Sequence, residues 1–139
     1  IAINDLAFKA ELGPDGERGF TVLAGGGTAL MCRSAGILHE YTPATELYRV
    51  SEAVLMVFKE HGDYEHRQRN RMKFMIKKLG WDRFLEEYRK ALAWCEGEGA
   101  VAQLHIAPPE MESTPTWDRG AAPDTTTIAA RVASVSPNG

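Results

Sequence analysis

The sequence predicts an α+β fold, in which an antiparallel hairpin of an incomplete sheet is covered by three or four helices and followed by an irregular C-terminal tail. Near the N-terminus, apolar side chains alternate with polar or small ones, which is typical of strands. Later segments carry apolar residues at helical spacing, which is typical of helices that cover a sheet. We expect a partial domain over residues 1–96 and a linker or flexible tail over 97–139.

The hairpin is expected within residues 3–24. Gly13-Pro14-Asp15-Gly16 favours a type I turn, because proline suits its second position and aspartate and glycine suit the positions after it. Residues 19–24 then form the returning strand. Ile1-Ala2-Ile3 also has a strand-like composition. In the first strand one face, expected to be the better buried, carries Leu6, Phe8, Ala10 and Leu12. The other face carries Ala7, Lys9 and Glu11.

Three helices are expected after the hairpin. The first begins at Thr42-Pro43, where threonine caps and proline needs no hydrogen-bond donor, and it ends at Gly62. The second spans about residues 63–79 and the third about 81–94. Residues 28–41 lack a clear period, and a short helix around residues 29–33 would raise the number to four.

The chain after Gly97 has a different composition, rich in proline, glycine, threonine and alanine, which buries little surface. Val101, Leu104 and Ile106 could form one short docked strand. Two strands are too few to support the predicted helices, because an isolated hairpin is only marginally stable. We therefore expect further strands upstream, in a longer chain.

Bulk composition excludes several classes of function. The net charge of −3 gives no general attraction for polyanions, so any basic site must be local. Cys32 and Cys95 lie far apart and no cysteine–histidine ligand spacing is present, so the chain alone builds neither a zinc site nor an iron–sulfur cluster. No apolar run reaches the roughly 18 residues of a membrane helix. We expect a cytoplasmic protein without membrane contact.

A basic run is the sharpest local feature. Between His66 and the end of this run there are six basic residues and no acidic one: Arg67, Arg69, Arg71, Lys73, Lys77 and Lys78. On one continuous helix, Arg67, Arg71 and Lys78 share a stripe, and Arg69, Lys73 and Lys77 form the next one. The run is either a solvated face balanced by nearby acidic residues or a site for an anionic ligand. A non-catalytic module that binds nucleic acid or an acidic protein through residues 66–78 is the alternative function. Nucleic acid is the less favoured partner, because no aromatic residues interleave with the basic ones.

The triplet Gly25-Gly26-Gly27 is the second local feature. Three glycines after a strand allow the backbone to approach a flat or anionic ligand closely, but they also occur in ordinary bulges and turns. The triplet matches neither the dinucleotide fingerprint nor a P-loop, because Leu30 replaces the third required glycine and no Gly-Lys-Ser/Thr follows.

The order of these pieces resembles the siroheme-dependent sulfite/nitrite reductase family. The resemblance rests on "NDLAF", on "DGERGFTVLAGGG", on a Thr-Pro helix ending in "VFKEHGD", and on "RQRNRMKFMIKKLGWDRF". These blocks cover about residues 3–92 and look like the later part of one siroheme-binding repeat. Residues 97–139 show no such similarity.

The resemblance implies a six-electron reductase that converts sulfite to sulfide or nitrite to ammonia, with electrons from ferredoxin or a flavoprotein. Its cofactors would be siroheme and a [4Fe–4S] cluster. The family's basic pattern falls on Arg67, Arg71 and Lys73, and its glycine-rich loop on Gly25, Gly26 and Gly27. The family commonly continues this loop with Leu-Gly, whereas this chain has Thr28-Ala29. Because the cluster cysteines and substrate-binding lysines are absent, the segment would position siroheme, with the rest of the reductase chain as its partner.

Overall fold

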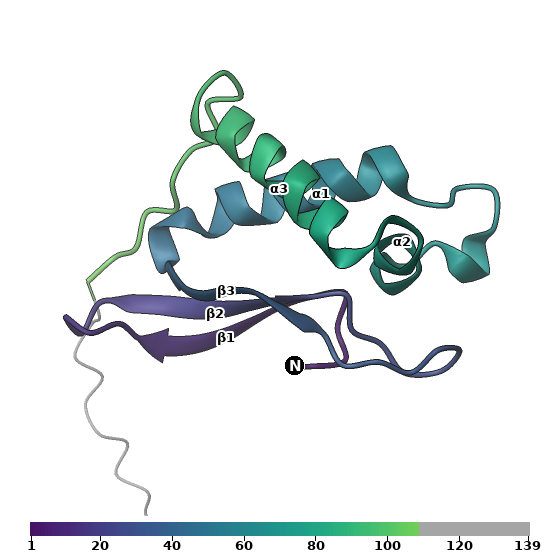
Figure 1. Ribbon diagram of the computed structural model, residues 1–139. Coiled ribbons are helices and arrows are strands. Elements are labelled where there is room, and N and C mark those ends of the chain that lie inside the picture. The colour runs from purple at the N-terminus through teal and green to yellow at the C-terminus, as the bar shows by residue number, and fades with distance from the viewer. Residues whose placement is uncertain (109–139) are drawn as a thin grey trace, which may run out of the picture. The chain divides into compact units, whose positions relative to one another are not determined.

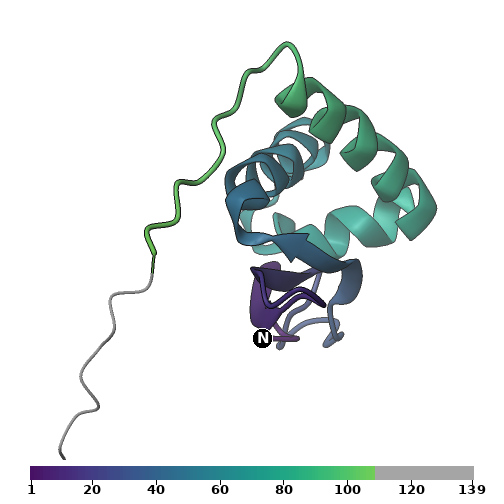
Figure 2. The same ribbon diagram turned by 90° about the vertical axis from the view of Figure 1, so that its left-hand side faces the viewer.

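The computed structural model describes residues 1–108 and shows an α+β fold, as expected (Figure 1). An antiparallel sheet of three strands in the order β1-β2-β3 carries the helices on one face (Figure 2). The elements are β1 (Leu6–Leu12), β2 (Arg18–Ala24), β3 (Gly36–Pro43), α1 (Leu47–His61), α2 (Met72–Leu79) and α3 (Trp81–Glu96), with single 3₁₀ turns η1 (Ala44–Glu46) and η2 (Arg67–Arg69). The part of the expected tail from residue 109 onward lies outside the described residues.

The predicted β1–β2 hairpin is confirmed, and its register places Phe8 opposite Val22. Its turn is closed by a hydrogen bond of 2.9 Å from the Gly16 N–H to the Gly13 carbonyl, and Gly16 takes a φ of +76° that favours glycine. The expectation of strand structure at Ile1-Ala2-Ile3 is wrong. Residues 1–5 form turns, because the Asn4 N–H bonds back to the Ile1 carbonyl rather than to a neighbouring strand.

Residues 29–33 form a loop and not the short helix considered there, and a third strand, β3, follows this loop. Gly27 and Arg33 exchange two backbone hydrogen bonds of 3.0 Å, which close a loop instead of a helical turn. Ala29 and Met31 in that loop have positive φ values of 64° and 57°, which a right-handed helix excludes. The pairing of β3 with β2 is irregular around Val22, so β3 shows no strict alternation in the sequence.

The start of α1 also differs from the prediction. Thr42 and Pro43 end β3, and η1 separates them from α1, which begins at Leu47. Thr42 pairs with Phe20 of β2, so it serves the sheet and does not cap a helix. The predicted end at Gly62 is confirmed, since the Gly62 N–H bonds to the Phe58 carbonyl at 2.9 Å.

The core lies between the helices and the sheet. Trp81, Phe84 and Tyr88 of α3 form a row of aromatic contacts, with ring centroids 5.4 and 6.4 Å apart. At the end of that row the Tyr88 hydroxyl is 2.6 Å from His39 Nε2 on β3, so a hydrogen bond joins the helical layer to the sheet. The buried core cluster comprises Ala24, Ala53, Val54, Val57, Met72, Met75, Ile76, Phe84, Tyr88, Ala91 and Cys95.

The helix predicted over residues 63–79 is shorter than expected, since α2 begins only at Met72. The Asp63 carboxylate accepts the His66 N–H at 3.0 Å and directs the chain into the isolated turn η2. Arg71 is extended, with φ −135° and ψ 146°. The basic residues therefore do not form two stripes along one helix.

Residues 97–99 form a turn and residues 100–108 are irregular, so no strand forms between Gly97 and Pro108. Arg49 donates from Nε to the Val101 carbonyl at 2.9 Å, and the Leu104 N–H bonds to the Thr45 carbonyl at 2.7 Å. The compact unit extends to Ala107. Within residues 1–108 no helix combines the length and the apolar character required to cross a membrane.

Truncation tests whether the contacts of residues 98–107 stabilise the fold. We expect removal of residues 108–139 to leave the melting temperature of the chain unchanged. Removal of residues 98–139 also deletes the contacts of Val101 and Leu104, and should lower it by about 5 °C, equivalent to roughly 1 kcal/mol. Circular dichroism melts of the two truncated chains and the whole chain measure this, and equal melting temperatures for both truncations would contradict it.

The His39–Tyr88 pair makes stability depend on pH. Burial lowers the pKa of His39 below 6.5, so the unfolded chain takes up the proton first and stability falls as the pH drops through about 6.5. We expect the melting temperature to fall between about pH 7.5 and about pH 5.5, and to fall less in His39→Gln. His105→Gln changes an exposed histidine and serves as the control. An unaltered pH slope in His39→Gln would refute this role.

Candidate functional site

The glycine triplet lies at a crowded crossing of the backbone. The Gly25 N–H bonds to the Asp5 carbonyl at 2.7 Å and the Gly26 N–H to the Asn4 carbonyl at 3.0 Å. Gly25 has a φ of +80°, and a Cβ there would lie 2.6 Å from Cδ1 of Ile76 on α2. The three glycines therefore let the N-terminal residues and α2 approach the end of β2 on opposite sides.

Lys73 is buried next to the triplet, with 2% of its surface exposed. Its ammonium donates to the Thr28 carbonyl at 2.7 Å, and a Cβ at Gly27 would lie 2.9 Å from its Cδ. No carboxylate among residues 1–108 forms an ion pair with it. The hydrogen bond to Thr28 holds the side chain against the loop that runs from Gly27 to Arg33, and Nζ also lies 5.3 Å from the centroid of the Phe74 ring.

Arg71 lies directly before α2 and is about half exposed. Its Nε donates to Oδ2 of Asp5 at 2.6 Å. Its Nη groups have no hydrogen-bond partner within the described part of the chain, which leaves that edge of the guanidinium accessible to a ligand. Arg67 lies in η2 with an exposed side chain. The structure thus brings Lys73 and the triplet into contact and places Arg71 beside them through Asp5, whereas Arg67 lies in the separate turn η2.

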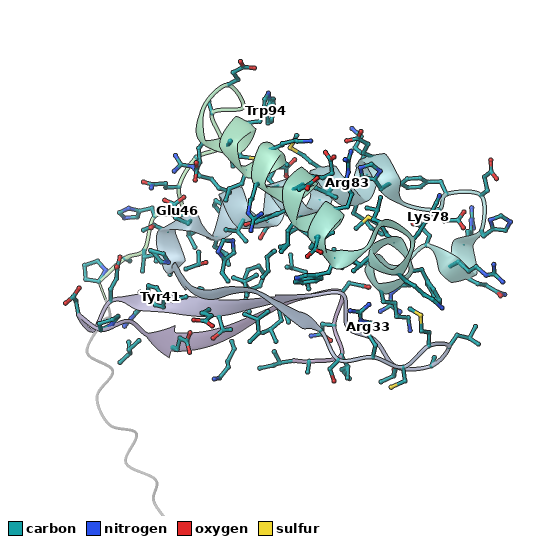
Figure 3. The ribbon with its side chains drawn as sticks, viewed as in Figure 1. Arg33, Tyr41, Glu46, Lys78, Arg83 and Trp94 are labelled. Atoms are coloured by element: carbon teal, nitrogen blue, oxygen red, sulfur yellow. The ribbon has the colours of Figure 1, made fainter. Side chains whose placement is uncertain are left out.

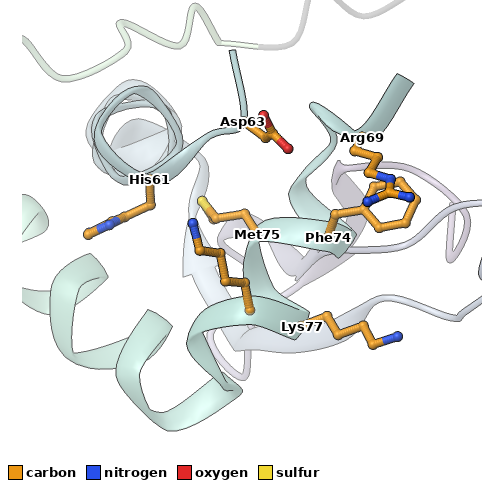
Figure 4. A pocket seen from close by; sticks show the side chains of 7 residues that line it. His61, Asp63, Arg69, Phe74, Met75 and Lys77 are labelled. Carbon is orange, nitrogen blue, oxygen red and sulfur yellow. The ribbon is translucent and has the colours of Figure 1, made fainter. Parts of the chain in front are cut away.

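The remaining basic residues face a different space. Arg69, Lys77 and Lys78 line an open cavity of about 360 Å³, together with His61, Asp63, Phe74 and Met75 (Figure 4). Ile76 and Lys73 point from α2 towards the triplet, whereas Met75 and Lys78 lie on the other side of the helix. In Figure 3, Lys78 lies on the helical layer and Arg33 near the loop below it. Hydrogen bonds from His66 lower the pKa of Asp63, so the carboxylate that lines this cavity already has hydrogen-bond donors within its own loop.

Asp5 is the residue of this corner that the sequence did not reveal. Its Oδ1 accepts the N–H of Met72, the first residue of α2, at 3.1 Å, while its Oδ2 accepts from Arg71. Aspartate is a common helix cap, but it normally precedes the helix directly. Here Asp5 and α2 are far apart in the sequence, so no local sequence pattern predicts their contact.

The donor set suits an anionic ligand and not a metal cluster. Cys32 is exposed and Cys95 is fully buried, and both are free thiols. Residues 1–108 contain no group of three histidine, cysteine or acidic side chains that could hold a metal ion. Guanidinium and ammonium groups beside a glycine loop can instead hold carboxylates.

Comparison with known proteins relates the chain to one family. Residues 1–95 match the family model described as the nitrite and sulphite reductase 4Fe-4S domain. The chain is 34% identical over 91 residues to a ferredoxin–nitrite reductase of Leptolyngbya laminosa, covering 65% of this chain and 18% of that protein. It is 29% identical over 82 residues to the sulfite reductase [NADPH] hemoprotein beta-component of Staphylococcus haemolyticus, covering 55% and 14%.

A solved structure shows the same likeness. The chain superposes on the Mycobacterium tuberculosis NirA protein with a TM-score of 0.54 and 28% identity, covering 81% of this chain and 20% of that one. The chain spans about a fifth or less of the length of the relatives that it matches.

The crossing at the triplet can be tested by adding a methyl group. A Cβ at Gly26 would lie 2.9 Å from the Asn4 carbonyl oxygen and closer still to that of Ala2, both of them backbone atoms. We expect Gly26→Ala to lower the free energy of unfolding by about 1–3 kcal/mol in urea denaturation. Gly97→Ala is the control, because its nearest neighbour would be at an ordinary 3.4 Å, and should cost less than about 0.5 kcal/mol. Equal losses in the two variants would argue against the crossing.

Proposed function

Because the chain belongs to the nitrite and sulphite reductase 4Fe-4S domain family, we propose that it is the segment of a sulfite or nitrite reductase that helps to position siroheme. The observation that carries the proposal is the corner at which the buried Lys73 and the half-exposed Arg71 lie beside the glycine triplet. The whole enzyme would reduce sulfite to sulfide or nitrite to ammonia, with electrons from ferredoxin or a flavoprotein.

The residues at this corner fit the chemistry of siroheme, which carries many carboxylates around its macrocycle. The free edge of the Arg71 guanidinium suits a two-pronged contact with one carboxylate, and Arg67 can reach a second from η2. Lys73 would add a positive charge next to the loop. Gly25, Gly26 and Gly27 have no side chains and would let a flat ring approach the backbone closely. When bound, siroheme supplies the iron at which sulfite or nitrite is reduced.

The segment would hold the cofactor without completing the active site. Neither Cys32 nor Cys95 belongs to a ligand cluster in the described part of the chain. The [4Fe–4S] cluster and the substrate-binding groups would therefore come from the rest of the reductase chain, which is the obligatory partner in this proposal. The role of these residues is to orient the macrocycle and to neutralise its carboxylates.

The alternative of a non-catalytic module rests on a continuous basic helix over residues 66–78. That helix is interrupted at Asn70 and Arg71, and Lys73 is buried. Arg69, Lys77 and Lys78 line a separate cavity and are not part of the corner at the triplet. No specific observation favours nucleic acid or an acidic protein as the ligand of this run.

Cofactor retention in the full-length reductase tests the proposal. We expect Arg67→Ala and Arg71→Ala each to purify with less siroheme and an unaltered fold. Loss of one charge-assisted contact should weaken retention by about tenfold. Lysine at either position should restore only part of it, because the two-pronged contact requires the planar guanidinium. Siroheme is measured by its absorbance after extraction, and the fold by circular dichroism.

Lys77→Ala and Lys78→Ala are matched controls, since each removes one positive charge from an exposed side chain that lines the cavity and does not lie against the triplet. Both should retain full siroheme. Full occupancy in the double variant Arg67→Ala/Arg71→Ala would show that these residues do not hold the cofactor. If the lysine variants lost as much siroheme as the arginine variants, the effect would reflect general charge and not the proposed contacts.

A further inference from the structure

We propose that Asp5 is the positioning residue of this site, and that it orients the Arg71 guanidinium for a two-pronged contact with a carboxylate of the ligand. This inference rests on the proposed function, because it assumes that Arg71 holds an anionic cofactor. Asp5 is 37% exposed at its side chain and Arg71 44%, so the pair lies at the surface of the corner and not within the core.

The two oxygens of the Asp5 carboxylate have separate partners. Oδ2 accepts from Nε of Arg71 at 2.6 Å, and Oδ1 accepts the backbone N–H of Met72 at 3.1 Å. The Met72 bond fixes the carboxylate to the first turn of α2, so its other oxygen has a fixed place. The arginine is thus held by a group that is itself anchored to a helix.

The backbone of Asp5 makes a third link. Its carbonyl accepts the Gly25 N–H at 2.7 Å, so the same residue sets the position of the glycine triplet. The loop, the start of α2 and the guanidinium are all joined through one residue directly before β1. A shift of Asp5 would therefore move the cationic group relative to the loop.

The planar geometry of the Arg71 guanidinium determines which hydrogen bonds remain available to a ligand. The guanidinium has five N–H donors in a rigid planar fork. With Nε engaged by Asp5, the edge formed by the two Nη groups stays available for two parallel hydrogen bonds to another carboxylate. An exposed arginine otherwise samples many rotamers, and fixing it beforehand removes part of the entropy cost of binding.

Asp5 also carries a negative charge, which opposes an anionic ligand. The two effects have opposite signs, so a single substitution distinguishes them. Asp5→Asn keeps an oxygen for the Met72 N–H but loses the acceptor for Arg71, and it makes the site more positive by one charge. If charge alone governed binding, this variant would hold siroheme more tightly; if positioning governs, it holds siroheme less tightly.

We expect the Asp5→Asn variant of the full-length reductase to release siroheme about threefold to tenfold faster, a change typical of losing one oriented charged contact. Its melting temperature should stay close to that of the unaltered enzyme, because asparagine also caps helices well. In an Arg71→Ala background the same change should have no further effect on release, since Asp5 acts through Arg71. Release is followed by the loss of siroheme absorbance during dialysis.

Asp63→Asn is the matched control. It removes the same charge from another acid that accepts a backbone N–H at the start of a turn, and should leave siroheme release unchanged. Unchanged or slower release in Asp5→Asn, with siroheme lost from Arg71→Ala, would overturn the inference and leave the proposed function intact. Equal acceleration in the Arg71→Ala background would assign Asp5 a purely structural role. Full siroheme in Arg71→Ala would reject the proposed function and this inference with it.

Discussion

The close approach of three backbone segments at Gly25–Gly27 is the constraint on which the rest of the structure depends. The N-terminal residues bond to the triplet on one side, and Ile76 and Lys73 of α2 lie against it on the other. A side chain at Gly25 or Gly27 would collide with α2, and one at Gly26 with the residues before β1. The sheet, the short helix and the buried ammonium can share this corner only because the crossing has no side chains of its own.

Much of the fold follows from local sequence patterns. The β1–β2 alternation, the turn at Gly13–Gly16 and the apolar stripes of α1 and α3 predict their elements because each is specified by neighbouring residues. β3 was missed because its irregular pairing with β2 removes the alternation. The early start predicted for α2 was wrong. The Asp63 carboxylate accepts the His66 N–H and starts a separate turn, and the helical spacing of the charged residues does not reveal this interruption.

The candidate site was predictable in its residue types and not in its arrangement. The basic run and the glycine triplet stand out in the sequence, and Lys73 does contact Gly27. The sequence could not show that Lys73 is buried while Lys77 and Lys78 line an open cavity, because that division depends on how α2 packs against the sheet. Nor could it reveal Asp5, whose partners are distant in the chain.

The capping of α2 from the far end of the chain has a consequence for the order of folding. A helix of eight residues is too short to form alone in water, and its first N–H bonds to Asp5, the residue directly before β1. We therefore expect α2 to become structured after the hairpin and the α1–α3 pair, and to open first under native conditions. Backbone amides of α2 should then exchange with solvent faster than those of α3, so the part of the chain that carries Lys73 would be the last to become rigid.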